Sequence, residues 1–163
     1  ARHRDDLVCV AAEATATPTG SQPIHWVAIR LATGERFEAL IAPRGPLAPT
    51  TARHSGIPES DVRAGEDLDA FLARWRAFLR PSDVLCTWGR HAPGLLDGRA
   101  DALPTLRIDA RQIAREVHRG RIGPVDAWCA GQGVAVVPLG RGRAGARLGM
   151  LAAAVRQLLS PNP

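Results

Sequence analysis

An amphipathic helix pattern that passes directly into a short apolar strand constrains the fold of this chain most. Between residues 66 and 80, apolar side chains recur every three or four positions, which gives a helix one apolar face. Pro81 ends that helix, and the apolar run at residues 83–89 follows at once. A helix that leads straight into a strand is typical of a crossover between parallel strands. We therefore expect residues 83–89 to lie beside the first strand of the chain.

Three strand patterns precede the helix. Residues 7–12 form a continuous apolar run, typical of a central buried strand, and the polar residues 13–20 are expected to end it as a loop. Residues 24–31 predict a strand with one face fully buried. Residues 35–42 return after a Thr-Gly turn, so these two segments predict a hairpin. The first third of the chain is therefore expected to form three antiparallel strands.

The second half of the chain alternates short strands with helices. Asp109 ends a short edge strand at residues 106–109 and is expected to cap the next helix. Helices are predicted at residues 49–56, near 93–96, and at 110–117, 125–130 and 144–159. The predicted fold is α/β: a mixed five-stranded sheet, with a three-strand antiparallel meander plus two parallel strands and helices on both faces. We expect one domain over residues 1–163, excised from a longer chain.

All 21 basic residues are Arg, and the net charge is +5. Guanidinium groups bind phosphates bidentately, which favours a nucleic-acid ligand, although a GC-rich genome explains the same composition. Arginines are densest at Arg141, Arg143 and Arg147, just before or within the last helix. Trp88 is the aromatic candidate for stacking on a base, with burial at the strand end as the alternative.

The cysteines and the apolar runs bear on location. Cys9, Cys86 and Cys129 form no CxxC pair, and the odd count predicts reduced thiols in the cytoplasm and no zinc site. No apolar run approaches the roughly 20 residues of a membrane span, and no signal-peptide pattern is present. We therefore expect no membrane partner.

Several local motifs resemble one family of nucleases. Residues 40–43 and 55–57 are similar to the segment after that family's third strand, and residues 67–79 to its next helix. The Leu-Cys-Thr-Trp-Gly run at 85–89 resembles the strand end of the branch that trims histone-mRNA and small-RNA ends, and residues 106–111 resemble a further segment. Together with the order of elements, these motifs resemble the DEDDh 3′-5′ exonucleases of the ribonuclease H-like fold.

The resemblance also implies where catalytic residues would stand. The family holds two divalent ions with four carboxylates and uses a His as general base. Its Asp-x-Glu aligns with Ala11 and Glu13, and a later Asp aligns with Ala92. Its His-x-Ala-Leu-x-Asp motif aligns with Ala144 at the His and Gly149 at the Asp. Only Glu13 matches, and a solvated loop carboxylate is its alternative interpretation. We therefore assign no catalytic residue and no metal ligand, and treat these five positions as vestigial.

These features lead to one functional hypothesis with two alternatives. The hypothesis is a catalytically inactive exonuclease-like module that binds RNA or another single-stranded nucleic acid, or acts as a protein scaffold, beside a partner domain in a longer chain. The expected contacts are Trp88, Arg141, Arg143 and Arg147, and no cofactor is expected. The alternatives are an active exonuclease with a rearranged site that uses Mg²⁺ or Mn²⁺, and a structural dimerisation domain. We expect Ala11, Ala92 and Gly149 to converge beside Trp88 as an emptied pocket.

Overall fold

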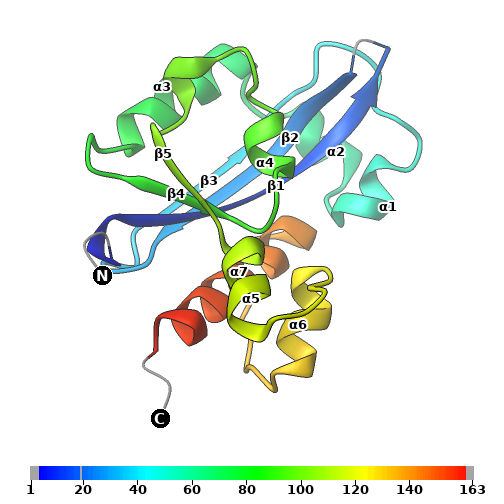
Figure 1. The fold of residues 1–163 in the computed structure, drawn as a ribbon. Coiled ribbons are helices and arrows are strands. Elements are labelled where there is room, and N and C mark those ends of the chain that lie inside the picture. The colour runs from blue at the N-terminus through cyan, green and yellow to red at the C-terminus, as the bar shows by residue number, and fades with distance from the viewer. Residues whose placement is uncertain (1–3, 19, 161–163) are drawn as a thin grey trace.

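A five-stranded mixed sheet forms the centre of the computed structural model, which describes residues 4–18 and 20–160. The strand order is β3-β2-β1-β4-β5, so the first strand of the chain lies in the middle (Figure 1). The strands are β1 (Leu7–Thr17), β2 (Gly20–Arg30), β3 (Arg36–Leu40), β4 (Val84–Thr87) and β5 (Leu106–Asp109). The predicted fold class is confirmed.

The strand pairing follows the predicted topology. β1 pairs antiparallel with β2, and β2 pairs antiparallel with β3. β4 joins the other edge of β1 in parallel, with Cys86 opposite Cys9, and β5 adds parallel to β4 with Asp109 opposite Thr87. The crossover expected from the helix-to-strand transition is therefore present, and it places the carboxyl ends of β4 and β5 side by side.

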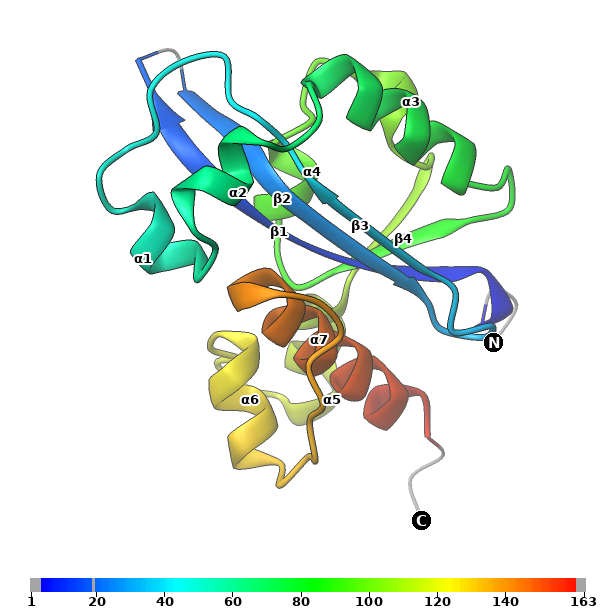
Figure 2. The same cartoon turned by 180° about the vertical axis from the view of Figure 1, so that it is seen from behind.

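Helices cover both faces of the sheet. α3 (Leu68–Phe78) and α4 (His91–Gly94) lie on one face, and α7 (Gly142–Leu159) lies on the other with α5 (Ala110–His118) and α6 (Val125–Gly131) packed around it (Figures 1 and 2). The remaining helical turns are η1 (Arg4–Asp6), α1 (Thr51–Ser55), α2 (Glu59–Arg63) and η2 (Ala100–Ala102). None of the helices in the described ranges combines the length and apolar character needed to cross a bilayer.

The sheet separates two apolar cores. Trp26 packs with Phe71 and Trp75 of α3 on one face, with ring centroids 5.7 and 5.4 Å from the Trp26 ring. Val27, the next residue of β2, belongs to the opposite core with Leu148 of α7. β2 is thus buried on both faces, not on one face as its sequence suggested. Each fully buried large apolar side chain contributes about 1.5–3 kcal/mol, so both layers stabilise the central strands.

β1 is longer than its apolar run predicts. Residues 13–17 were expected to form a loop, yet they continue the antiparallel ladder with β2. A register shift between Glu13 and Ala14 accommodates the change from apolar to polar sequence. Thr15 then bonds across to Thr51 of α1, with 3.0 Å between the hydroxyl oxygens. Tertiary pairing overrides the loop-like composition, and it places Glu13 in a strand with only 7% of its surface exposed.

A buried ion pair joins the N-terminal end of β4 to the end of β2. The guanidinium of Arg30 contacts the carboxylate of Asp83, and the two side chains are each 1% exposed. Arg30 also donates to the backbone oxygen of Phe78 at 3.1 Å and to Glu35 at 3.1 Å. Asp83 accepts from the backbone N–H of Arg80 at 2.8 Å. The pair therefore connects the ends of β2, α3 and β4.

A candidate nucleic-acid interface at the strand ends

A cavity of about 480 Å³ opens where β4 ends beside the middle of β1, between α4 and α7. In open α/β sheets, the carboxyl ends of the strands are where ligand sites form. Ala11, Glu13, Trp88 and Ala92 all line this cavity. The structure thus brings together three of the five positions that the family resemblance marked as vestigial, with Trp88 beside them.

Glu13 is the charged centre of the cavity. Its Oε1 accepts a hydrogen bond from Nη1 of Arg147 at 3.2 Å, and Nε of Arg143 lies 3.9 Å from the same oxygen. Both arginines project from the first half of α7, one helical turn apart. A buried carboxylate needs a paired charge to be tolerated, and here guanidinium groups supply it. The interpretation of Glu13 as a solvated loop carboxylate is therefore wrong.

Trp88 lies at the cavity wall in a fixed orientation. Its indole N–H donates to the backbone oxygen of Gly123 at 3.1 Å, and its ring centroid lies 5.6 Å from that of Trp128. The side chain is only partly buried. Burial at the strand end therefore holds in part, because the ring packs into the fold and still lines the cavity. Stacking on a base stays a prediction.

The turn after β4 is held by Asp109 at the end of β5. Gly89 adopts a left-handed conformation with φ of 83°, which favours glycine, and its N–H donates to Oδ1 of Asp109 at 2.8 Å. The same oxygen accepts from the N–H of Arg111 at 3.0 Å. The prediction that Asp109 caps the following helix is confirmed. Because one carboxylate bonds both segments, the β4 turn and the start of α5 keep a fixed separation.

Two vestigial positions do not reach the cavity. Ala144, in the first turn of α7, is fully buried in the core between α7 and the sheet. At Gly149, an added Cβ would come 2.1 Å from the backbone oxygen of Val137. The expectation that Gly149 converges beside Trp88 is wrong, because that face of α7 packs against the residues 134–139 link. The face of α7 turned to the cavity carries Arg143, Arg147 and Leu151.

Arg141 also lies apart from the cavity that Arg143 and Arg147 line. Its guanidinium pairs with Asp61 of α2, and its backbone N–H donates to Oε1 of Glu38 at 3.2 Å. The three arginines that the sequence grouped together thus divide between two surfaces. Only the two within α7 belong to the candidate interface.

The remaining polar residues that line the cavity are Thr87, His91, Arg111 and Asp126. His91 has no acidic neighbour in the sequence, and Arg111 and Asp126 fall within predicted helices. The sequence did carry a signal that could have placed Arg111 at the site. Arg111 follows the Asp109 cap by two residues, and Asp109 ends the strand that was expected at the sheet edge. Within residues 4–18 and 20–160, no three His, Cys, Asp or Glu side chains gather as a candidate metal site.

Comparison with known proteins gives a structural answer only. No family model and no curated protein matches the sequence. Among solved structures, the nuclease domain of 3′hExo, a DEDDh family member bound to rAMP, superposes with a TM-score of 0.75 and 16% identity, over 95% of this chain and 92% of that one. Exonuclease X in complex with 5′ overhanging duplex DNA gives a TM-score of 0.69 and 16% identity, over 94% and 90%.

A third similar structure is the RNase domain of the yeast Pop2 protein, with a TM-score of 0.68 and 12% identity, over 94% of this chain and 78% of that one. At these low identities, the superpositions establish the fold alone. The agreement extends over nearly the whole chain and includes the mixed sheet and its flanking helices. The chain therefore has the ribonuclease H-like fold of the DEDDh exonuclease domains.

Proposed function

We propose that this domain binds single-stranded nucleic acid, RNA in particular, in the Glu13 cavity and does not hydrolyse it. The observation that carries the proposal is the position of Arg147, whose guanidinium bonds to Glu13 at 3.2 Å. In two-metal nucleases, divalent ions neutralise the carboxylates at this kind of site and activate the attacking water. A guanidinium also neutralises the carboxylate, but it cannot act as a Lewis acid on water.

The residues present do not fit a two-metal centre. Each Mg²⁺ ion requires several anionic oxygens at about 2.0–2.1 Å. Glu13 is already engaged by two arginines, and Ala11 and Ala92 offer no oxygen. The positive charge of Arg143 and Arg147 also opposes the approach of a divalent cation.

A two-residue shift in the family alignment supports the same conclusion. Reading the His-x-Ala-Leu-x-Asp motif from Gly142 places Ala144 at the motif's Ala and Arg147 at its Asp. This register agrees with the structure, because Arg147 faces Glu13 and Gly149 does not. On this alignment the metal-binding Asp is replaced by a residue of opposite charge, which favours binding without hydrolysis.

The cavity retains what a nucleic-acid strand needs. Arg143 and Arg147 offer guanidinium donors to phosphate oxygens. Trp88 offers a fixed aromatic face, and base stacking on such a face is worth about 1–3 kcal/mol per base. Similar structures were solved with rAMP and with duplex DNA, and a third concerns recognition of a histone mRNA stem-loop. These ligands favour RNA as the first nucleic acid to test.

Binding can be tested by fluorescence anisotropy with labelled single-stranded RNA and DNA at several salt concentrations. The variant R143Q/R147Q should bind RNA more weakly, and the slope of log Kd against log salt should fall by about 1.4, about 0.7 for each lost contact. R36Q/R53Q is the matched control, because Arg36 and Arg53 are exposed and do not line the Glu13 cavity. E13Q/R143Q/R147Q removes the same charges without an unpaired carboxylate. Absence of RNA binding at low salt would favour a scaffolding role.

Hydrolysis is tested separately with 5′-labelled RNA in Mg²⁺ and in Mn²⁺. Unchanged strand length supports the proposal. Shortening that disappears in E13Q would establish the active exonuclease alternative. We further propose that the domain is an accessory module beside a nucleic-acid-processing partner in the cytoplasm. Expression of the full-length gene product, with location and copurifying RNA determined, tests that context.

A further inference from the structure

A second cavity, of about 620 Å³, lies next to the Glu13 cavity around the first turn of α5. Arg90, Arg111, Arg115 and Arg121 line it, and Asp109 is its one acidic lining residue. Gly89 and Arg111 line both cavities, so the two cavities adjoin each other at these residues. The volume falls within the range of about 300–1,000 Å³ that is usual for small-molecule sites. The excess of positive charge indicates an anionic ligand.

The arginines of this cavity lack ion-pair partners within the described chain, as do Arg36 and Arg53 among others. Nine arginines form ion pairs with carboxylates; they are Arg30, Arg44, Arg63, Arg74, Arg76, Arg80, Arg141, Arg143 and Arg147. Among the residues that the structure describes, Arg90, Arg115 and Arg121 have no such partner. Asp109 cannot neutralise them all, since its Oδ1 already accepts from two backbone N–H groups. The cavity therefore carries charge that nothing within the described chain balances.

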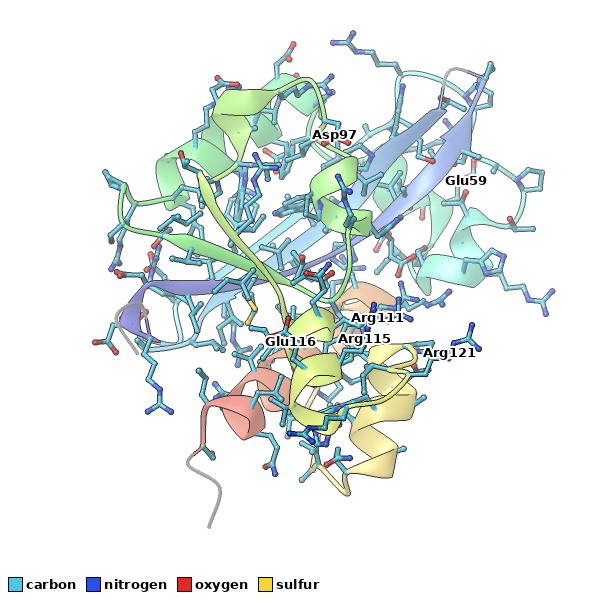
Figure 3. The ribbon with its side chains drawn as sticks, viewed as in Figure 1. Glu59, Asp97, Arg111, Arg115, Glu116 and Arg121 are labelled. Carbon is cyan, nitrogen blue, oxygen red and sulfur yellow. The ribbon has the colours of Figure 1, made fainter. Side chains whose placement is uncertain are left out.

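Arg111 is held in place, and it ties α5 to the loop that carries Arg121. Arg111 donates through Nε and Nη2 to the backbone oxygen of Ile122, at 2.9 and 2.7 Å. This fork joins the first turn of α5 to the loop that carries Arg121. Arg119, which ends α5, has φ of 48°, an uncommon conformation for a residue other than glycine, and it turns the chain back along the helix. Figure 3 shows Arg111, Arg115 and Arg121 gathered on one side of α5, while Glu116 lies on its other side.

We propose that this cavity binds a ligand with several adjacent phosphate groups. A single carboxylate ligand would leave most of the four guanidinium groups unpaired, whereas consecutive phosphates present anionic oxygens to each of them. The phosphates belong either to a free oligophosphate or to a nucleic-acid strand that continues from the Glu13 cavity. The first source is independent of the proposed function, and the second rests on it.

Isothermal titration of the whole chain with inorganic tripolyphosphate and with single-stranded RNA tests the inference. The key variant is R115Q/R121Q, because both side chains are exposed and make no hydrogen bond within the described chain, so the fold should be retained. We expect its affinity for tripolyphosphate to fall about tenfold or more, the loss expected for removal of charge-assisted donors. R36Q/R53Q removes the same charge elsewhere and should change the affinity less than about threefold.

The two ligands distinguish the source of the phosphates. Tripolyphosphate binding that R115Q/R121Q weakens and R143Q/R147Q leaves intact supports a free oligophosphate, even if RNA does not bind. RNA binding that R115Q/R121Q weakens, without tripolyphosphate binding, supports the strand as the ligand. Equal losses in R115Q/R121Q and R36Q/R53Q would reduce the effect to overall charge and overturn the inference. Failure of both ligands to bind would also overturn it.

Discussion

Arg30 and Asp83 form an ion pair whose two side chains are each 1% exposed, between the end of β2 and the residue before β4. Burial acts to lower the pKa of Arg30, but the hydrogen bonds to Asp83 and Glu35 outweigh it and raise that pKa. The charged pair is therefore favoured in the folded state. Arg30 also donates to Glu35 and to the backbone oxygen of Phe78, and Asp83 accepts from the backbone N–H of Arg80.

Removing one partner of this pair should strongly destabilise the protein. Asp83→Ala leaves the Arg30 charge buried and uncompensated, and such losses cost about 3–5 kcal/mol. Urea denaturation measures the change in the free energy of unfolding. The matched control is Arg63→Gln, which breaks the exposed pair of Arg63 with Glu59 on α2. That change should cost less than about 1 kcal/mol, and equal costs for the two variants would contradict the argument.

His25 should make stability depend on pH. Its side chain is fully buried, and its Nε2 lies 2.9 Å from Oε1 of Glu38. Burial lowers its pKa, although Glu38 opposes the shift in part. The folded state therefore holds this proton less tightly than the unfolded chain, whose His pKa is about 6.5. The stabilisation is fully present above that value and is lost as pH falls from about 6.5 through the lower folded pKa.

Thermal unfolding across this pH window checks the prediction. The melting temperature of the native chain should fall with decreasing pH, and His25→Gln should flatten the curve even if it lowers the melting temperature at every pH. A fall of the same steepness in His25→Gln would show that another group is responsible.

Carboxylates added around Glu13 should convert the cavity to a cation site. A11D/R147D removes the guanidinium that pairs with Glu13 and adds two carboxylates to the lining. Oxygen ligands of this kind suit Mg²⁺ and Mn²⁺. Titration calorimetry with Mn²⁺ should detect binding to A11D/R147D and not to the native chain. In the single variant A11D, Arg147 remains and binding should be much weaker. If A11D/R147D fails to bind Mn²⁺, these side chains do not converge closely enough.

Gly149 should not tolerate a side chain. An added Cβ would lie 2.1 Å from the backbone oxygen of Val137, so Gly149→Ala must displace the residues 134–139 link. Overpacking of this kind costs about 1–3 kcal/mol. At Gly131, the last residue of α6, an added Cβ meets nothing within 4 Å. Gly131→Ala should therefore be neutral or stabilise by up to about 1 kcal/mol. Chemical denaturation measures the free energy of unfolding of both variants. A loss of stability in Gly149→Ala alone assigns the effect to packing and not to helix propensity.

The fold was predictable because hydrophobic periodicity is local and strong in this chain. The helix at α3 and the strand at β4 adjoin each other, and the right-handed crossover rule leaves few places for β4. The extent of β1 was not predictable in the same way. Residues 13–17 alternate Glu or Thr with small Ala side chains, which is a weak apolar signal for a strand, and their strand conformation depends on pairing with β2.

The site was predictable in place but not in detail. Ala11 and Ala92 line the cavity beside Trp88 as expected, whereas Gly149 does not. A shift of two residues along a helix rotates a side chain by about 200°. An alignment error of that size therefore exchanges the cavity-facing side of α7 for the side packed against the residues 134–139 link. The Arg115 and Arg121 cavity gave no sequence signal, because arginine is frequent throughout the chain and only tertiary structure separates paired from unpaired groups.

The contacts of Arg30 also have a kinetic consequence. Its partners Glu35, Phe78 and Asp83 stand 5, 48 and 53 residues along the chain, so the full set closes only after the α3 crossover has docked β4 on β1. We expect the guanidinium to remain hydrated until then and to leave water late in folding. Loss of Asp83 should therefore speed unfolding far more than it slows folding, which makes this pair a determinant of the lifetime of the native state.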